Sequence, residues 1–211
     1  MSFKIILADD HPLILTGLRS LISNLQPTCD VVAEAHQVSF LFSSLKQHPC
    51  DLLITDFSMP GDKCNDGLNM IQQLRRDYPT LPIIVLTQIH NAGILQSLIQ
   101  LGVKGVLLKK AVIKELSTAI GHVLSGQCFI GDSVKALLNE SCIIEYGVNI
   151  QLTPKEVEVV RLLANGMSVT QVAEYLHRSI KTISTQKKSA MHRLGLTSDS
   201  ELYHYAKEQG L

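Results

Sequence analysis

Over roughly its first 125 residues the chain alternates short apolar runs with longer amphipathic segments. The apolar runs, such as IIVL and VVA, lack polar interruptions, which is typical of parallel strands buried on both faces. The segments between them repeat apolar residues at helical spacing. Strands are expected at 3–8, 31–35, 51–55, 82–87 and 103–109, and helices at 13–25, 38–48, 67–78, 92–101 and 113–124. Right-handed crossovers then predict an α/β fold, a doubly wound, five-stranded parallel sheet in the flavodoxin-like order 2-1-3-4-5.

The periodic pattern is lost between residues 126 and 151, where glycines punctuate the sequence. This stretch is expected to be a linker with a short helix around 133–139. It separates a first domain at residues 1–125 from a second domain at residues 152–211.

The second domain reads as four helices, at 154–164, 169–176, 180–194 and 198–209. Thr153, Pro154 and Glu156 form the pattern of a capping box with proline at the first helical position. A glycine-containing turn at 166–168 joins the first two helices, and a basic helix follows the short second one. This order predicts an all-α helix-turn-helix domain.

Composition places the chain among ordinary folded proteins, with 45% hydrophobic and 18% charged residues. The five cysteines are odd in number and form no Cys-x-x-Cys pair, so reduced thiols are expected instead of a zinc site or disulfide framework. No apolar run approaches the roughly 20 residues needed to cross a bilayer, and the beginning does not resemble a secretory signal. A cytoplasmic protein without a membrane partner is expected.

Acidic side chains follow two of the expected strands. Asp9 and Asp10 come directly after the first strand, and Asp56 follows the third. The carboxyl ends of these strands meet at one edge of a doubly wound sheet, so the three carboxylates should converge there. Such a cluster is costly without a cation, and carboxylate oxygens suit Mg²⁺. A magnesium site is therefore expected.

Two further polar residues belong to the same edge. Thr87 ends the fourth strand and Lys109 the fifth. Each residue alone has an ordinary explanation, since an aspartate or threonine can begin a turn or cap a helix and a lysine can be solvated. Together they predict phosphoryl transfer, with Asp56 as nucleophile and with the metal, Lys109 and Thr87 neutralising the phosphoryl oxygens.

Residues 3–125 resemble the receiver domains of two-component response regulators, which share the acidic pair, the central aspartate, the threonine and the lysine. The resemblance implies that Asp56 accepts phosphate, that the Ser58 backbone carbonyl joins Asp9, Asp10 and Asp56 around Mg²⁺, and that Thr87 and Lys109 read the phosphate. Two departures concern the switch. Val106 occupies a position that is often aromatic, and the loop at 61–66, GDKCND, is longer than usual.

The expected third helix of the second domain is locally basic although the formal net charge of the chain is zero. Between Arg178 and Arg193 there is no acidic residue. A charge run is usually only a solvated face. Here an apolar stripe, expected to be buried, opposes a polar and cationic face, which is what insertion into the DNA major groove requires. The stripe comprises Ile183, Ala190, Met191 and Leu194, and the polar face Lys181, Ser184, Thr185, Lys188 and His192.

The run from Leu152 to Leu202 resembles LuxR-type DNA-binding domains along its whole length. By position in that family, Ser184, Thr185 and Lys188 would face base edges. Phosphate contacts would come from Lys181, Thr182, Lys187 and Ser189. A lysine often stands at the position of Ser184, so the base preference is not carried over.

The combined architecture is similar to the NarL/FixJ class of response regulators. The segments MPGDK, SIKTIS and QKKSAM resemble one branch that regulates envelope, capsule or motility genes. The resemblance implies double-stranded DNA, a histidine kinase or histidine-phosphotransfer protein, and either a homodimer or pairing with an auxiliary LuxR-type regulator. It predicts a transcription factor that is phosphorylated without being a turnover enzyme, although it can dephosphorylate itself.

Three alternatives remain open. An aspartyl-phosphate phosphatase or transferase would share the acidic site but turn over a substrate. A LuxR-type regulator could instead sense a small molecule through its first domain, and a pseudo-receiver would never be phosphorylated. A test of phosphotransfer to Asp56 distinguishes a phosphorylated regulator from both the small-molecule sensor and the pseudo-receiver.

Overall fold

The computed structural model describes residues 2–25, 28–59, 66–144, 152–194, 196 and 198–211. The chain divides into two compact units, one of residues 1–87 and 98–135 and the other of residues 88–97 and 136–211. The loop expected at 61–66 lies outside the described residues except for Asp66, as do residues 145–151 of the expected linker.

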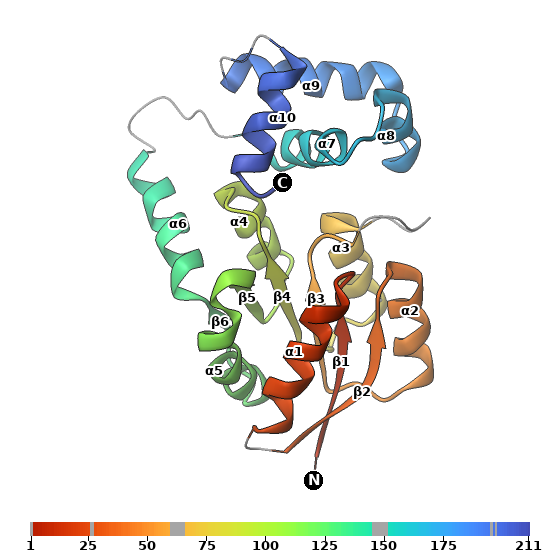
Figure 1. The fold of residues 1–211 in the computed structure, drawn as a ribbon, viewed down its shortest axis with the longest axis vertical. Helices are drawn as coiled ribbons and strands as arrows, with labels where there is room; N and C mark the ends of the chain where they lie inside the picture. Colours follow the sequence, from red (N-terminus) through yellow and green to blue (C-terminus); the bar gives the residue numbers. More distant parts are fainter. Residues whose placement is uncertain (1, 26–27, 60–65, 145–151, 195, 197) are drawn as a thin grey trace. The chain divides into compact units, whose positions relative to one another are not determined.

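The first unit is built on a parallel sheet in the order β2-β1-β3-β4-β5-β6 (Figure 1). The predicted order of the first five strands is confirmed, and a short sixth strand follows β5. The strands are β1 (Phe3–Ala8), β2 (Cys29–Ala35), β3 (Leu52–Asp56), β4 (Ile83–Thr87), β5 (Gly105–Leu108) and β6 (Phe129–Ile130).

Helices cover both faces of this sheet, as its apolar strands require. The helices are α1 (Pro12–Ser23), α2 (Val38–Gln47), α3 (Gly67–Asp77) and α5 (Val112–Leu124), with a 3₁₀ turn at Lys109–Ala111. Helix α4 (Ala92–Gln100) crosses the division between the two units. One face packs on α1 and α5, where alternate strand residues such as Ile5, Leu7 and Ile54 meet Leu18 and Ile120. The opposite face carries α2 and α3 (Figure 1). Because strands and helices alternate along the chain and the strands are parallel, the carboxyl ends of the strands all lie at one edge of the sheet.

The segment expected to be only a linker begins as part of the sheet. Strand β6 pairs with β5, with Phe129 opposite Gly105 and Ile130 opposite Val106. Helix α6 (Asp132–Ile144) follows and is longer than the helix expected at 133–139. At the beginning of α6, Glu115 Oε1 accepts a hydrogen bond from the Asp132 backbone N–H at 3.3 Å. Strand β6 is therefore determined by backbone pairing with β5. A strand of only two residues is too short to give a periodic pattern in the sequence.

In the second unit, the four helices expected after residue 152 are present. They are α7 (Pro154–Ala164), α8 (Val169–Tyr175), α9 (Ile180–Leu194) and α10 (Asp199–Glu208). The predicted capping box at Thr153 and Glu156 is confirmed, and two more begin α8 and α10. Apolar side chains from α7, α8 and α9 form a common core of Val159, Leu162, Leu163, Val172, Ala173 and Ile183.

A tight turn connects α8 to α9. His177 has φ of 52°, a left-handed conformation that is uncommon outside glycine. The next residue, Arg178, donates its backbone N–H to Ala173 O at 2.8 Å, which closes the end of α8. Ser179 Oγ then accepts the Thr182 N–H at 3.1 Å at the beginning of α9. The expected helix-turn-helix order is therefore present.

Candidate functional site

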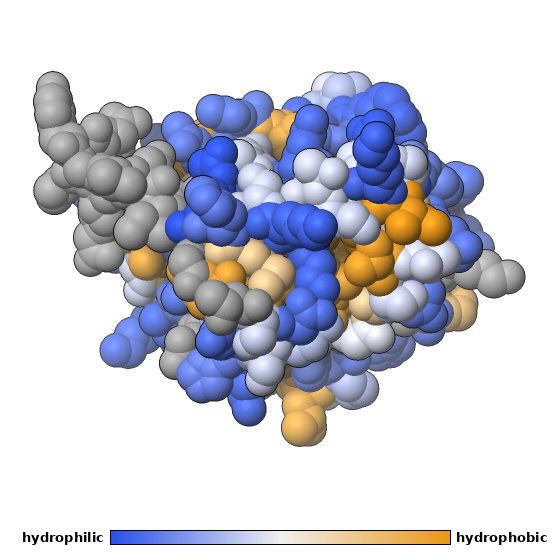
Figure 2. All heavy atoms as spheres, turned by 90° about the horizontal axis from the view of Figure 1, so that it is seen from above, coloured by the Kyte–Doolittle hydropathy of each residue, from blue (hydrophilic) through white to orange (hydrophobic). Residues whose placement is uncertain are grey.

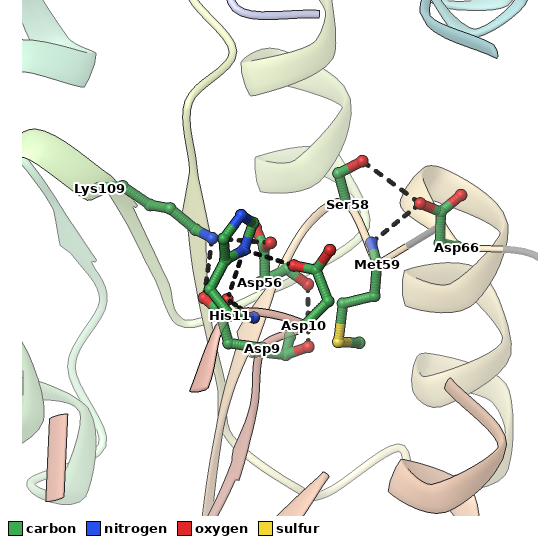
Figure 3. Close-up of polar contacts among 9 residues, drawn as sticks. Asp9, Asp10, His11, Asp56, Ser58, Met59, Asp66 and Lys109 are labelled. Carbon is green, nitrogen blue, oxygen red and sulfur yellow. Dashed lines mark hydrogen bonds and ion pairs between the residues drawn. The ribbon is translucent and has the colours of Figure 1, made fainter. Parts of the chain in front are cut away.

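An acidic pocket lies at the carboxyl edge of the sheet, directly after β1 and β3 (Figure 3). Asp9 and Asp56 are buried, at 0% and 3% exposed, while Asp10 is partly exposed. Ligand atoms of Asp9, Asp10, His11 and Asp56 all lie within 4.8 Å of one another. The three carboxylates therefore lie close together at the strand ends, as expected from the sequence.

Lys109 bridges two of these carboxylates. Its Nζ donates to Asp56 Oδ2 at 2.8 Å and lies 2.8 Å from Asp9 Oδ2. Lys109 begins the 3₁₀ turn after β5 instead of ending the strand, so its long side chain reaches back across the strand ends (Figure 3). Burial alone would lower the pKa of Lys109, but the two carboxylates outweigh it and raise the pKa.

The charge of Asp56 is not fully balanced by this contact. Burial raises the pKa of Asp56 to about 7; Lys109 opposes the rise and Asp9 adds to it. Three carboxylates share the pocket with one lysine ammonium, so the pocket is electronegative and favours a cation.

The oxygen atoms fit a hard divalent cation. Among the described residues, neither Asp9 Oδ2 nor Asp10 Oδ1 accepts a well-aligned hydrogen bond, although both are buried. Lys109 Nζ lies 2.8 Å from Asp9 Oδ2, and His11 Nδ1 lies 2.7 Å from Asp10 Oδ1. Buried oxygens without aligned donors and an all-carboxylate set suit Mg²⁺. The acidic residues present therefore fit the metal expected from the sequence.

His11 takes part in the pocket more closely than its place at the beginning of α1 suggests. It occupies the N-cap position, but its side chain does not cap the helix. Instead its ring Nδ1 lies 2.7 Å from Asp10 Oδ1 and 3.2 Å from Asp9 Oδ1, while its backbone N–H donates to Asp9 Oδ1 at 2.9 Å. In the sequence, the one sign of this role was that His11 follows the acidic pair. Because His11 also precedes Pro12, the same position is explained by the beginning of a helix.

The structure also places the other two expected site residues. Thr87 ends β4, is 1% exposed, and follows Leu86, which pairs with Asp56 across the β3–β4 ladder. Ser58 lies two residues beyond Asp56, and its hydroxyl donates to Asp66 Oδ2 at 3.3 Å. Asp66 was not singled out from the sequence, because its partner lies across a loop. Val106 is fully buried in β5, between Val85 of β4 and Ile130 of β6.

Helix α9 presents a polar face. Lys181, Thr182, Thr185 and Lys188 are exposed, and Ser184 is partly exposed. On the opposite stripe Ile183 and Ala190 are fully buried, while Met191 and Leu194 are only half-buried. The face drawn uppermost in Figure 1, where α9 runs, is largely hydrophilic with smaller apolar areas (Figure 2).

Two residues expected to contact phosphates already have partners within the second unit. Ser189 Oγ donates to Glu156 Oε1 at 2.6 Å, and Lys187 Nζ pairs with Asp199 Oδ2 at 2.6 Å. Burial alone would raise the pKa of Glu156, but hydrogen bonds from Ser189 and Thr153 and the charge of Arg193 lower it. By contrast, Lys181 and Lys188 have no ion-pair partner in the part of the chain that the structure describes.

Comparisons with known proteins agree with both halves of the chain. Residues 5–121 match the response regulator receiver domain, and residues 150–206 match the bacterial regulatory proteins of the luxR family. The described residues include no helix that is both long enough and apolar enough to span a membrane.

Relatives match over nearly the whole length. The transcriptional regulatory protein RcsB of Salmonella typhi is 42% identical over 97% of this chain and 94% of its own. The oxygen regulatory protein NreC of Staphylococcus haemolyticus is 31% identical over 99% of this chain and 98% of its own.

A solved structure of RcsB from Salmonella enterica serovar Typhimurium, bound to the promoter rprA in the presence of phosphomimetic BeF3⁻, matches with a TM-score of 0.83. It is 40% identical and covers 98% of this chain and 99% of that chain. The resemblance carried by the segments MPGDK, SIKTIS and QKKSAM is a resemblance to RcsB, and these matches confirm it. The chain is a member of the response regulator family, an RcsB-like transcriptional regulator with a receiver domain and a LuxR-type DNA-binding domain.

Proposed function

We propose that phosphorylation of Asp56 switches DNA binding by α9. The observation that carries this proposal is the Asp56 carboxylate, buried at the strand ends and held 2.8 Å from Lys109 Nζ beside Asp9. The receiver is assigned to residues 1–125, the linker to 126–151 and the DNA-binding domain to 152–211.

Each pocket residue has a definite role in this proposal. Asp9, Asp10 and Asp56, with the Ser58 backbone carbonyl, would hold Mg²⁺, which supplies positive charge against the phosphoryl oxygens. Lys109 would add an ammonium group and Thr87 a hydroxyl donor for the same phosphoryl oxygens. After transfer, the Asp56 carboxylate has become an acyl phosphate, and its negative charge lies on the phosphoryl oxygens. Lys109 can then pair with the phosphoryl group.

We propose that the phosphoryl transfer is a nucleophilic displacement at phosphorus. An Asp56 carboxylate oxygen forms the new O–P bond as the P–N bond of a phosphohistidine breaks, and the leaving imidazole retains the electron pair and is then protonated. The donor is a histidine kinase or histidine-phosphotransfer protein. Water attacking the same phosphorus would return Asp56 to its carboxylate, so self-dephosphorylation is included without substrate turnover.

For the output, we assign Ser184, Thr185 and Lys188 to base edges and Lys181, Thr182, Lys187 and Ser189 to phosphates. The structures of Salmonella RcsB on promoter DNA with a phosphomimetic, and of two RcsB dimers on two parallel DNAs, support a DNA-bound homodimer. Pairing with an auxiliary LuxR-type regulator, a cytoplasmic location, and control of envelope, capsule or motility genes complete the proposal.

The decisive experiment treats the full-length protein with acetyl phosphate and Mg²⁺ and measures its mass and its affinity for promoter DNA. We expect one added phosphoryl group and tighter DNA binding in the native protein, and neither change in Asp56→Asn. Equal labelling of Asp56→Asn would refute the assignment of the phosphoacceptor. Labelling without any change in DNA affinity would refute the switch.

A further inference from the structure

A buried carboxylate outside the acidic pocket fastens the segment that follows Asp56. Asp66 is 0% exposed and occupies the N-cap position of α3, yet its side chain does not form the capping hydrogen bond of that helix. Its Oδ2 instead accepts the Met59 backbone N–H at 2.9 Å and the Ser58 hydroxyl at 3.3 Å (Figure 3). A buried carboxylate needs such donors to offset its desolvation.

A second link joins the same two segments. Gly67, with φ of 64°, donates its backbone N–H to Phe57 O at 2.9 Å. Residues 57–59 are thus held to residues 66 and 67 by three hydrogen bonds, two of which are accepted by the Asp66 carboxylate. These bonds connect the segment after β3 to the beginning of α3.

The contact to Met59 fixes the direction of a carbonyl group. The Met59 N–H and the Ser58 C=O belong to one planar trans peptide and point in opposite directions. Because the N–H points at Asp66, the Ser58 carbonyl points away from it. In Figure 3, Asp66 and the acidic pocket lie on opposite sides of Ser58 and Met59. The carbonyl is therefore directed to the side on which Asp10 and Asp56 lie.

We propose that Asp66 is a positioning residue for metal-dependent phosphorylation. It touches neither the nucleophile nor the reacting phosphorus. By orienting the Ser58–Met59 peptide, it would position the backbone carbonyl that, with the three carboxylates, would hold Mg²⁺. This inference rests on the proposed function, since it assigns an outer partner to a ligand of the proposed metal site.

The test compares Asp66→Ala and Asp66→Asn with the native full-length protein. Binding of Mg²⁺ alone is measured by titration calorimetry on unphosphorylated protein, and the initial rate of labelling by acetyl phosphate is measured against Mg²⁺ concentration. Loss of an outer partner typically weakens metal binding about tenfold or more. We expect Asp66→Ala to raise both the Mg²⁺ dissociation constant and the half-saturating Mg²⁺ by about tenfold, with much of the maximal rate recovered at high Mg²⁺.

Asp66→Asn retains an oxygen that can accept the Met59 N–H, so a smaller rise in both constants is expected, and this variant carries the test if the alanine variant does not fold. Glu115→Ala is the matched control, because it removes another carboxylate that accepts a backbone N–H, that of Asp132, away from the pocket. The control should keep the native Mg²⁺ dependence.

An unchanged Mg²⁺ dissociation constant in a folded Asp66 variant would overturn the inference, as would an equal change in Glu115→Ala. Failure of the native protein to be labelled at all would instead refute the proposed function. The two failures are therefore distinguishable.

Discussion

At the scale of single residues, Asp56 combines two opposing demands. A phosphoacceptor must be ionised to attack phosphorus, but its carboxylate is only 3% exposed and lies near Asp9. Burial raises its pKa from 3.8 to about 7, against the opposing charge of Lys109. Without a bound cation, the ionised form of Asp56 therefore costs folding free energy at neutral pH.

The first stability prediction concerns Asp56→Asn in the absence of divalent cations. Between pH 3.8 and about 7 the folded protein retains a proton that the unfolded chain has released. Raising the pH through this window therefore destabilises the native protein but not the variant at this position. We expect Asp56→Asn to raise the free energy of unfolding by about 1–3 kcal/mol at pH 8 and by less at pH 5.

Urea unfolding of both proteins at the two pH values, with a chelator present, measures this difference. Asp132→Asn is the control, because Asp132 is an exposed residue of the same unit. Added Mg²⁺ should narrow the gap at pH 8 by stabilising the native protein. A gap that is independent of pH would show that the charge of Asp56 is not its source.

Much of the pocket could be predicted from the sequence because strand ends converge. Asp9, Asp10, Asp56 and Lys109 each come at or next to the end of an apolar run, and the sheet order then brings them to one edge. Asp66 could not be found in this way. Its contact to Met59 depends on how the chain closes between β3 and α3, which no periodic pattern encodes.

At the scale of elements, α9 divides its polar residues between folding and recognition. Ser189 donates to the buried Glu156 at 2.6 Å, which joins α9 to the beginning of α7. Lys188, the neighbouring residue, is exposed and has no ion-pair partner in the described residues. Two adjacent residues that were both expected to contact DNA therefore differ in what they do for the fold.

Alanine substitutions should separate these roles. Lys188→Ala should weaken binding to promoter DNA, reduce the preference for promoter over unrelated DNA, and leave stability unchanged. Ser189→Ala should leave Glu156 short of a donor and reduce the stability of the helix-turn-helix by about 1–2 kcal/mol. Titrations of promoter DNA and of unrelated DNA measure the first effect, and amide hydrogen exchange in α7 and α9 measures the second.

Phosphorylation by acetyl phosphate should be native in both variants, which is the control for an intact receiver. A stable Ser189→Ala variant that had lost DNA affinity would instead assign Ser189 chiefly to recognition. Loss of phosphorylation in Lys188→Ala would contradict the separation of the two domains.

Helix boundaries were more predictable than the sixth strand, for a physical reason. The capping box at Thr153 satisfies backbone donors through neighbouring side chains, so the signal is local in sequence. Strand β6 is formed by pairing with Lys104, Gly105 and Val106, more than 20 positions earlier. Such pairing is decided by the edge of the finished sheet.

At the scale of the whole molecule, β6 covers the edge of the sheet. Phe129 and Gly131 donate backbone N–H groups to Lys104 O and Val106 O at 2.8 and 2.9 Å. An uncovered edge strand invites pairing with other chains. A receiver that ends at residue 125 should therefore be about 2 kcal/mol less stable than one that ends at residue 139, since it lacks both bonds.

Urea unfolding and light scattering over a range of concentrations test this comparison of the two receivers. The shorter receiver should aggregate at lower concentration. As the control, Gly121→Ala in the longer receiver changes an open position of α5 and should leave aggregation unaffected. Equal stability and solubility of the two lengths would show that β6 contributes nothing to the sheet edge.

The position of β6 also sets an order of events during synthesis. β5 ends at Leu108 and β6 begins at Phe129, so α5 must leave the ribosome before the sheet is complete. At about 5–20 residues per second, that delay is about 1–4 s. The β5 edge is open during this interval, before any of α7–α10 has been made. The emerging receiver is thus most exposed to capture by chaperones or neighbouring chains while the residues between β5 and β6 are being translated.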